Sequence, residues 1–290
     1  MSLFIASLNS GSNGNCYYVG NEEEAVLIDA GISCRETERR LLRLGLDKSK
    51  IKAIVITHEH SDHINGLYQL VKKNGWPVYI TPGTLAESRI DLSLYVVHTF
   101  DAGKIFHIGR LAIKAFQKFH DAADPHSVVV ECNDVRVGVF TDIGVVCPQV
   151  IEHFNTCHAV FLESNYDEEM LEKGPYPYHL KRRIRGGKGH ISNKQAIQLF
   201  KDHRSAFLSH LILSHLSQQN NDPHLVQHLF SAEAEGTRIV VASRTNESEV
   251  FHIQNTNHTF FSPLKEEFTQ AYFPPKKAKK VMNENQLSLF

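Results

Sequence analysis

The sequence of 290 residues is short of several features, and each shortage excludes a class of protein. Its five cysteines are an odd number without a CxxC spacing, which disfavours a disulfide framework and favours buried thiols in a reducing compartment. No apolar run reaches the roughly eighteen residues that a membrane helix needs. The first residues lack the basic segment that opens a signal peptide. We therefore expect a globular protein of the cytoplasm, with no membrane partner.

Charge of one sign is also lacking, because the formal net charge is only −1. No overall field draws the chain toward nucleic acid, so any basic surface must be local. With 42% hydrophobic and 22% charged residues, the composition is that of an ordinary globular protein. Histidine is the exception, with 18 residues against 3 Met and 1 Trp. Since histidine is the commonest metal ligand in proteins, its spacing indicates where chemistry is found.

Apolar periodicity predicts an α/β chain with a mostly antiparallel, strand-rich first half and an alternating second half. The predicted strands are 2–8, 16–20, 25–30, 52–57, 77–80, 94–98, 111–118, 127–132, 136–141, 208–214, 238–242 and 249–253. The predicted helices are 34–46, 148–154, 192–203 and 223–235. From about residue 254 the pattern decays into PPKKAKK and NEN, which is typical of a disordered tether. These patterns divide the chain into a domain at 1–253, a linker at 254–285 and a terminal peptide at 286–290.

The segment THEHSDH crowds metal-ligand residues directly after the predicted strand 52–57. They are His58, His60, Asp62 and His63. Imidazole and carboxylate groups suit Zn²⁺ or Mn²⁺, and a tight turn after a strand lets such side chains share one cleft. Two of them can face one metal and two a second. A solvated histidine-rich loop is the alternative, but residues of these types at these fixed offsets match chance poorly.

Two metal sites need further ligands, and three candidates each follow a predicted strand. They are His120 in KFHDAADPH, Asp142 in GVFTDIG and His215 in LILSHLSQQNN. A single histidine in a loop is more often a surface residue than a ligand, so none of them is specific alone. Their shared position after strands indicates that one edge of packed sheets presents them all.

These motifs, with Asp29 in LIDAG, resemble the metallo-β-lactamase fold over about residues 1–253. The resemblance implies an αββα four-layer sandwich of two mixed β-sheets flanked by helices. It also implies two divalent metal ions, Zn²⁺ or Mn²⁺, and a role for Asp29 in orienting the ligand loops. By this resemblance the first metal is held by His58, His60 and His120. The second is held by Asp62, His63 and His215, and Asp142 bridges the two.

The branch of the fold depends on the remaining motifs. A β-lactamase of this fold uses a cysteine at one metal, whereas His63 completes a set that thioester and phosphodiester hydrolases share, so a glyoxalase II-like thioesterase is an alternative. LESNYD (162–167) and GHISN (189–193) resemble tRNase Z-type nucleases. By that resemblance His190 is a general acid oriented by Glu163, and with Asp62 they are the predicted catalytic residues. Otherwise His190 caps the helix at 192–203 and Glu163 forms a surface pair.

A basic segment, KRRIRGGKGH, leads directly into His190. Backbone phosphates attract such clusters, and binding through them is salt-sensitive. A solvated helix face is the usual explanation of a basic run, but the position beside His190 favours nucleic-acid binding. The predicted contacts are Lys181, Arg182, Arg183, Arg185 and Lys188. The loop SGSNG (10–14) can offer backbone N–H groups to a phosphate, and a plain structural turn is the alternative.

The wider pattern resembles the YycJ/WalJ-type exonucleases, a bacterial branch tied to DNA metabolism and mismatch repair. It is carried by SLNSGSNGNCYYV, ESNYDEEML, GPYPYHLKRRI and GHISN. The resemblance implies a metal-dependent 5′→3′ exodeoxyribonuclease that acts in DNA repair. An RNA-processing nuclease of the same fold, similar to tRNase Z, is the alternative, so RNA is a second candidate substrate.

The last five residues, QLSLF, resemble the Q-L-[SD]-L-F peptide by which bacterial repair proteins dock into the sliding clamp. By that resemblance Leu287, Leu289 and Phe290 fill an apolar pocket while Gln286 hydrogen-bonds at its rim. A flexible linker before the peptide would let the domain and the clamp move independently. A tail that folds back on its own domain is the alternative.

Overall fold

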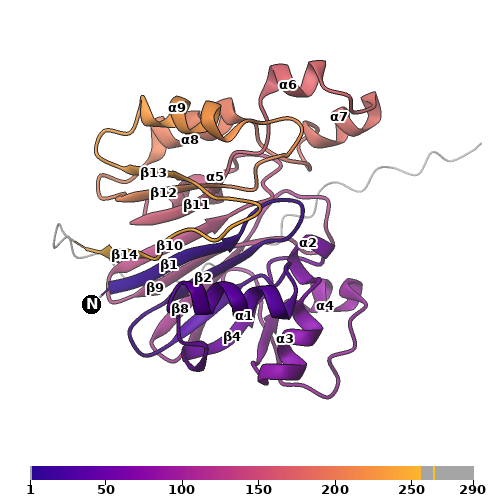
Figure 1. Ribbon diagram of the computed structural model, residues 1–290, viewed down its shortest axis with the longest axis vertical. Coiled ribbons are helices and arrows are strands. Elements are labelled where there is room, and N and C mark those ends of the chain that lie inside the picture. Colours follow the sequence, from indigo (N-terminus) through magenta and orange to yellow (C-terminus); the bar gives the residue numbers. More distant parts are fainter. Residues whose placement is uncertain (1, 256–263, 265–290) are drawn as a thin grey trace, which may run out of the picture.

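Two β-sheets pack face to face in the computed structural model, which describes residues 2–255 and 264 (Figure 1). Within those residues each sheet has seven strands, and helices cover the outer face of each. This arrangement is the predicted αββα sandwich. In each sheet one half is antiparallel and the other half is parallel.

The first sheet is antiparallel from β14 to β3 and parallel from β3 to β6. Its strands, in spatial order, are β14 (Phe251–Gln254), β1 (Ser2–Asn9), β2 (Cys16–Gly20), β3 (Ala25–Ile28), β4 (Ile51–Val55), β5 (Val78–Ile80) and β6 (Val97–Thr99). The first half of the chain is mostly antiparallel, as predicted, except for the parallel strands β3 to β6. Helices within residues 34–88 lie in the crossovers that parallel neighbours require.

The second sheet is parallel from β13 to β10 and antiparallel from β10 to β7. Its strands, in spatial order, are β13 (Arg238–Val241), β12 (His210–Ser214), β11 (Ala159–Glu163), β10 (Val135–Phe140), β9 (His126–Cys132), β8 (Leu111–Gln117) and β7 (Ile105–Ile108). Because β8 and β10 are both antiparallel to β9, they run in the same direction. The C-terminal ends of β8, β10, β11 and β12 therefore lie at the same edge of this sheet.

Nine α-helices lie within the described residues, together with a 3₁₀ turn at Lys48–Lys50. They are α1 (Cys34–Arg43), α2 (Ser61–Ile64), α3 (Leu67–Asn74), α4 (Pro82–Ser88), α5 (Pro148–Phe154), α6 (Glu168–Lys173), α7 (Tyr178–Ile184), α8 (Asn193–His203) and α9 (Pro223–Ser231). The predicted cap of α8 is confirmed: Ser192 and Gln195 form a reciprocal capping box. None of these helices is long and apolar enough to cross a bilayer.

Three apolar cores separate the four layers. Along β1 the side chains alternate, so that Leu3 and Ile5 face the second sheet while Ala6 and Leu8 face the helices α1 and α3. On the other side, α5, α8 and α9 cover the second sheet through residues such as Phe154, Phe200 and Phe230. Full burial of each large side chain contributes about 1.5–3 kcal/mol, so these cores hold the sheet edges in place.

Several elements were absent from the sequence-based prediction, namely α2, α3, α4, α6, α7 and β7. Each is short, between four and eight residues, and too brief to establish a helical or strand period. The five cysteines are buried and free, as predicted. Most of the predicted linker and the whole of the predicted clamp-binding peptide, including Gln286, Leu287, Leu289 and Phe290, lie outside the described residues.

Candidate metal centre and active site

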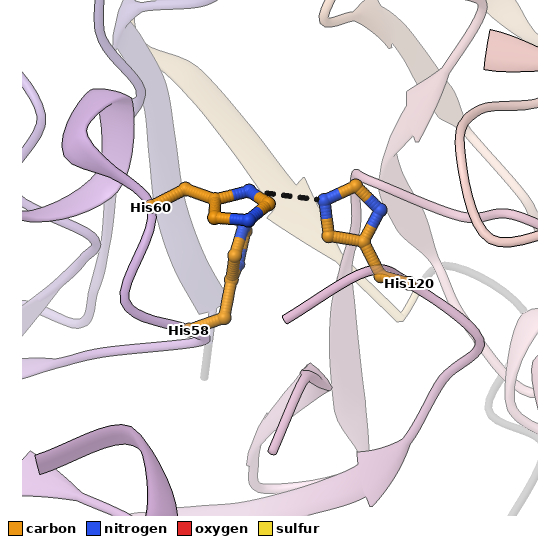
Figure 2. A group of neighbouring side chains, drawn as sticks. All are labelled: His58, His60 and His120. Carbon is orange, nitrogen blue, oxygen red and sulfur yellow. Dashed lines mark hydrogen bonds between the residues drawn. The ribbon is translucent and has the colours of Figure 1, made fainter. Parts of the chain in front are cut away.

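The seven predicted metal ligands converge at one edge of the sandwich. Figure 2 shows three of them, His58, His60 and His120, with their imidazoles directed toward one another. Nδ1 of His60 lies 3.2 Å from Nε2 of His120. The ring centroid of His58 lies 4.7 Å from that of His60 and 5.0 Å from that of His120. Segments that follow β4 and β8, in different sheets, thus build one cluster.

A second cluster adjoins the first and contains Asp62, His63 and His215. Nε2 of His215 lies 3.3 Å from Oδ2 of Asp62. Asp142 lies between the clusters: its Oδ2 is 3.0 Å from Nε2 of His63, and its Oδ1 is 3.7 Å from Nε2 of His120. The structure therefore brings all seven side chains together, in overlapping groups that include a further one of Asp142, Glu163, His190 and His215.

The donor set fits divalent metal ions. Tetrahedral coordination at about 2.0–2.1 Å places neighbouring ligand atoms about 3.3–3.4 Å apart, close to the separations between the paired atoms. Nε2 of His58 is buried and makes no hydrogen bond, whereas Oδ2 of Asp142 is buried with Nε2 of His63 at 3.0 Å. Leaving an atom such as Nε2 of His58 unsatisfied costs about 1–3 kcal/mol, and a bound cation would remove that cost.

The charge balance of the clusters agrees with this fit. Burial lowers the pKa of His120 to about 4 and that of His58 well below its usual value, which leaves both imidazoles neutral and able to donate lone pairs. Burial opposes protonation of His63 too, but the carboxylates of Asp29, Asp142 and Asp62 raise its pKa to about 10. Positive charge therefore stabilises these carboxylates in the buried region, and divalent ions would provide it.

Asp29 lies beneath the clusters and contacts both Thr57 and His63. One carboxylate oxygen accepts the backbone N–H of Thr57 at 2.8 Å, and the other lies 2.7 Å from Nδ1 of His63. These bonds hold the end of β4 and direct Nε2 of His63 toward Asp142. The next turn is equally constrained, because a Cβ added to Gly31 would lie 1.7 Å from the carbonyl oxygen of Asp62.

Backbone strain coincides with the site. Asp29, Asp142 and His215 have φ values of 63°, 54° and 56°, in the left-handed region that non-glycine residues rarely adopt. Each follows the end of a strand, where this conformation reverses the chain and turns the side chain inward. Conformations of this kind cost on the order of 1–3 kcal/mol and cluster at functional sites.

Glu163 and His190 form a pair beside Asp142. Oε1 of Glu163 lies 2.6 Å from Nδ1 of His190, and Oε2 accepts the backbone N–H of Ile143 at 2.7 Å. The Glu163 side chain is fully buried, whereas that of His190 is 20% exposed. The surface-pair alternative is therefore wrong for Glu163, and Ser192, not His190, caps α8.

The predicted basic cluster lies on α7 and in the loop that follows it. Nε of Arg183 lies 2.6 Å from Oδ2 of Asp121, and Oδ1 of Asp121 lies 3.6 Å from Nε2 of His120. Two other members of the cluster bind Glu172. Arg185 pairs with its carboxylate, and Lys181 donates a hydrogen bond to its backbone carbonyl oxygen. Arg182 and Lys188 are exposed, and no ion pair within the described chain involves either of them. The cluster thus borders the histidines, but only part of it is free for a ligand.

Two residues in the site, Asn15 and Lys118, were not predicted from the sequence. Nδ2 of Asn15 lies 3.1 Å from both Oδ2 of Asp62 and Nε2 of His63. Lys118 is buried below Asp142, and its ammonium group donates to the carbonyl oxygen of Thr141 at 2.6 Å. The unusual run NSGSNGN was the only signal for Asn15. Lys118 had none, because its role depends on contacts between strands.

The loop at residues 10–15 is mainly a structural turn. The N–H of Gly11 donates to the side chain of Asn15, and the N–H of Gly14 donates to the carbonyl oxygen of Gly11. The N–H of Asn15 donates to the carbonyl oxygen of Asp62. These amides therefore fix the ligand loop and are not available to a phosphate.

Comparison with known proteins agrees with the fold. A family model described as a Beta-lactamase superfamily domain matches residues 24–216. The crystal structure of the metallo-β-lactamase fold protein YhfI from Bacillus subtilis superposes with a TM-score of 0.68 at 13% identity. That superposition covers 87% of this chain and 100% of YhfI, and at this identity it supports the fold alone.

Two curated relatives are more similar in sequence. Exodeoxyribonuclease YycJ of Bacillus anthracis is 35% identical over 230 residues, which cover 78% of this chain and 87% of YycJ. Exodeoxyribonuclease WalJ of Streptococcus pneumoniae is 32% identical over 219 residues, covering 74% and 81% of the two chains. Together with the fold and the His/Asp clusters, these matches show that the chain is a metal-dependent hydrolase of the β-lactamase superfamily and belongs to the YycJ/WalJ family.

Proposed function

We propose that this protein is a two-metal phosphodiesterase that degrades DNA as a 5′→3′ exodeoxyribonuclease. The names of YycJ and WalJ support DNA as the substrate. The proposed ions are Zn²⁺ or Mn²⁺. We assign one ion to His58, His60 and His120, and the other to Asp62, His63 and His215, with Asp142 shared between them.

When bound, such ions supply Lewis acidity, which acidifies water and neutralises charge that develops on a phosphoryl group. The chain itself supplies proton transfer and orientation. Glu163 accepts a hydrogen bond from Nδ1–H of His190, which stabilises the charged imidazole and leaves Nε2–H to protonate the departing sugar oxygen. The partial exposure of His190 keeps the ring within reach of a substrate, while burial of Glu163 keeps its carboxylate in place.

One observation carries the choice of a phosphodiester over a thioester: the contact between Arg183 and Asp121. It places the basic helix α7 at the border of the first histidine cluster. A thioesterase needs neither a row of cations at this place nor a proton for its thiolate leaving group. A polyanionic strand needs both the cations and the acid. An RNA-processing nuclease would use the same groups, and the relatives' names favour DNA.

We also propose that the terminal peptide QLSLF docks the enzyme on the sliding clamp and that the enzyme acts in DNA repair in the cytoplasm. The support is the sequence of the last five residues, behind a lysine-rich and proline-containing segment. Deletion of residues 286–290 is expected to abolish clamp binding while cleavage of naked DNA continues. Unchanged affinity for the clamp would contradict the assignment.

The proposed activity is tested by adding Zn²⁺ or Mn²⁺ back to metal-free protein with end-labelled single- and double-stranded DNA and, in parallel, pre-tRNA. We expect stepwise shortening of DNA from the 5′ end with at least one metal. Asp142→Ala should lose its bound metal, measured by elemental analysis, and should no longer cleave DNA. Lys52→Gln, at the start of β4 and thus at the opposite edge, is the control. Cleavage of pre-tRNA alone, or full activity in Asp142→Ala, would overturn the proposal.

A further inference from the structure

A cavity of about 380 Å³ lies beside the second cluster, outside the set of metal ligands. It is bordered by the loop at Ser10, by the segment after β12 and by the segment after β13. Its connection to the metal centre is direct: Ser10 accepts the backbone N–H of His215 at 2.8 Å, and Leu216 is the next residue along the chain. A ligand in this cavity would therefore lie next to the ligand bound at the proposed metals.

The wall of the cavity combines apolar and polar groups. Leu216, Pro223 and Val241 provide apolar surface, and Ser217 and Arg244 provide a hydroxyl and a cation. The volume is near the lower end of the range for small-molecule sites, roughly 300–1,000 Å³. It is large enough for a phosphate together with its sugar. No carboxylate lines it, so the cation of Arg244 faces the cavity without an acidic neighbour among the lining residues.

Arg244 is half-buried, and it differs from the two buried arginines among the described residues, Arg40 and Arg136. Its Nη1 atom is buried without a hydrogen-bond partner, and no ion pair of its guanidinium occurs within the described chain. Arg40, by contrast, binds Glu36 and three further oxygen acceptors, and Arg136 binds Glu131. A buried charged donor without an acceptor is costly, and native proteins rarely retain one without a role.

The backbone around Arg244 is held firmly. The carbonyl oxygen of Arg244 accepts the side-chain amide of Asn13 at 2.7 Å, and the N–H of Ser10 donates to the carbonyl oxygen of Ser243 at 3.1 Å. These two bonds join the loop that contacts the metal ligands to the loop that carries the arginine. The backbone of Arg244 is therefore held near His215, while no hydrogen bond of its side chain occurs within the described chain.

We propose that this cavity is a phosphate subsite, in which Arg244 binds a phosphate of the nucleic-acid strand next to the one being cleaved. This inference rests on the proposed nuclease function. A guanidinium matches two phosphate oxygens with parallel N–H groups, which an ammonium does not. The hydroxyl of Ser217 supplies a further donor, and Leu216, Pro223 and Val241 accommodate the sugar. The subsite would hold the strand in register over the metal centre.

The test compares the parent protein with Arg244→Gln, Arg244→Lys and the control Arg110→Gln. Arg110 is exposed at the start of β8, at the opposite edge from His120, and its replacement changes the net charge equally. Binding is measured by fluorescence anisotropy with single-stranded DNA whose phosphorothioate linkages resist cleavage, at several salt concentrations. A thermal shift with deoxyadenosine monophosphate, and its loss in Arg244→Gln, measures the subsite without a DNA strand.

We expect Arg244→Gln to bind DNA about 10-fold to 100-fold more weakly and to lose about 0.7 from the slope of log K against log salt. Arg244→Lys should keep the slope and recover part of the affinity, and Arg110→Gln should behave like the parent. KM should rise in Arg244→Gln while kcat changes little. Its melting temperature should not fall, because the guanidinium has no partner to lose.

Two failures are distinguishable. If the parent cleaves DNA and Arg244→Gln keeps its affinity and salt slope, the subsite is overturned and the nuclease function stands. If the parent does not cleave DNA, the proposed function is overturned, and the subsite is then tested only by the thermal shift with deoxyadenosine monophosphate. Arg244-dependent binding would then support it, and the same thermal shift in parent and Arg244→Gln would overturn it.

Discussion

The orientation of a single imidazole separates the two hydrolytic chemistries considered for this fold. His190 cannot rotate freely, because its Nδ1 atom is held by Glu163, and Glu163 is itself held by the N–H of Ile143. Both Glu163 oxygens are thus occupied by the protein, which argues for an orienting role over metal binding. We therefore treat His190 as the proton donor and Glu163 as the residue that positions it.

Replacement of His190 by Ala is expected to lower kcat by about 10²- to 10⁴-fold, the usual contribution of general acid catalysis. Metal content should be unchanged, because His190 is outside the two assigned ligand sets. Elemental analysis and cleavage of labelled DNA measure the two quantities. His107→Ala, at an exposed position of the edge strand β7, is the control. Loss of metal in His190→Ala would show that His190 is a ligand.

Glu163→Gln tests the positioning role separately. The amide would present an N–H₂ group to Nδ1 of His190 and would no longer stabilise a charged imidazole. We expect a loss of kcat approaching that of His190→Ala, with little further loss in the double variant, because the two residues act as one unit. Independent, multiplicative losses in the double variant would contradict the pairing.

Among the elements, α6 and α7 form an excursion that stands out from the layers of the sandwich (Figure 1). A small apolar cluster of Tyr166, Leu171 and Ile184 holds the two helices together. The basic run on α7 was visible in the sequence, but its pairing was not. The structure alone shows that two cations of this run contact Glu172 and that Arg183 binds Asp121. Arg182 and Lys188 are then the members best placed to meet a phosphate.

The double variant Arg182→Gln with Lys188→Gln is expected to weaken DNA binding and to lower the salt slope by about 1.4, since each phosphate contact on a single strand contributes about 0.7. The kcat value should change little, because neither residue contacts the metal clusters. The matched control is Arg110→Gln with Lys52→Gln, at the opposite edge of the sheets. An equal loss of affinity in the control would indicate a general charge effect.

At the scale of the whole molecule, the edge opposite the metal clusters contributes a pH-dependent term to stability. Nδ1 of His158 accepts the backbone N–H of Arg136 at 3.1 Å, and its ring packs against Phe207. Burial, and then the nearby charge of Arg136, lower the pKa of His158 to about 4. The fold therefore requires this imidazole to be neutral.

Because the unfolded chain takes up this proton near pH 6.5 and the folded chain only near pH 4, the stabilisation is complete above pH 6.5 and is lost as the pH falls toward 4. The term is worth roughly 1–3 kcal/mol in the free energy of unfolding. His158→Asn keeps an acceptor for Arg136 but does not titrate. Urea unfolding should show the variant much less stable than the parent at pH 7.5, with a smaller difference at pH 4.5. An equal difference at both values would contradict the assignment.

The sequence by itself determined the local features: the period-two strands, the capping box of α8 and the H-x-H-x-D-H turn, whose identities depend on neighbours in the chain. Each metal-ligand candidate could be predicted because it follows a strand, and strands that share a direction expose their ends at one edge. The short helices α2 and α7 could not be predicted, because tertiary packing and not helical propensity stabilises them.

Only the tertiary structure decided which groups are paired and which are free. Asn15 and Lys118 enter the site, Glu172 removes two cations from the basic run, and Arg244 is left beside a cavity without a partner. Each of these outcomes joins residues from separate segments. The physical reason is that side-chain periodicity depends on residues that are neighbours in the sequence. Charge pairing and burial depend on distances that are set only when the two sheets pack together.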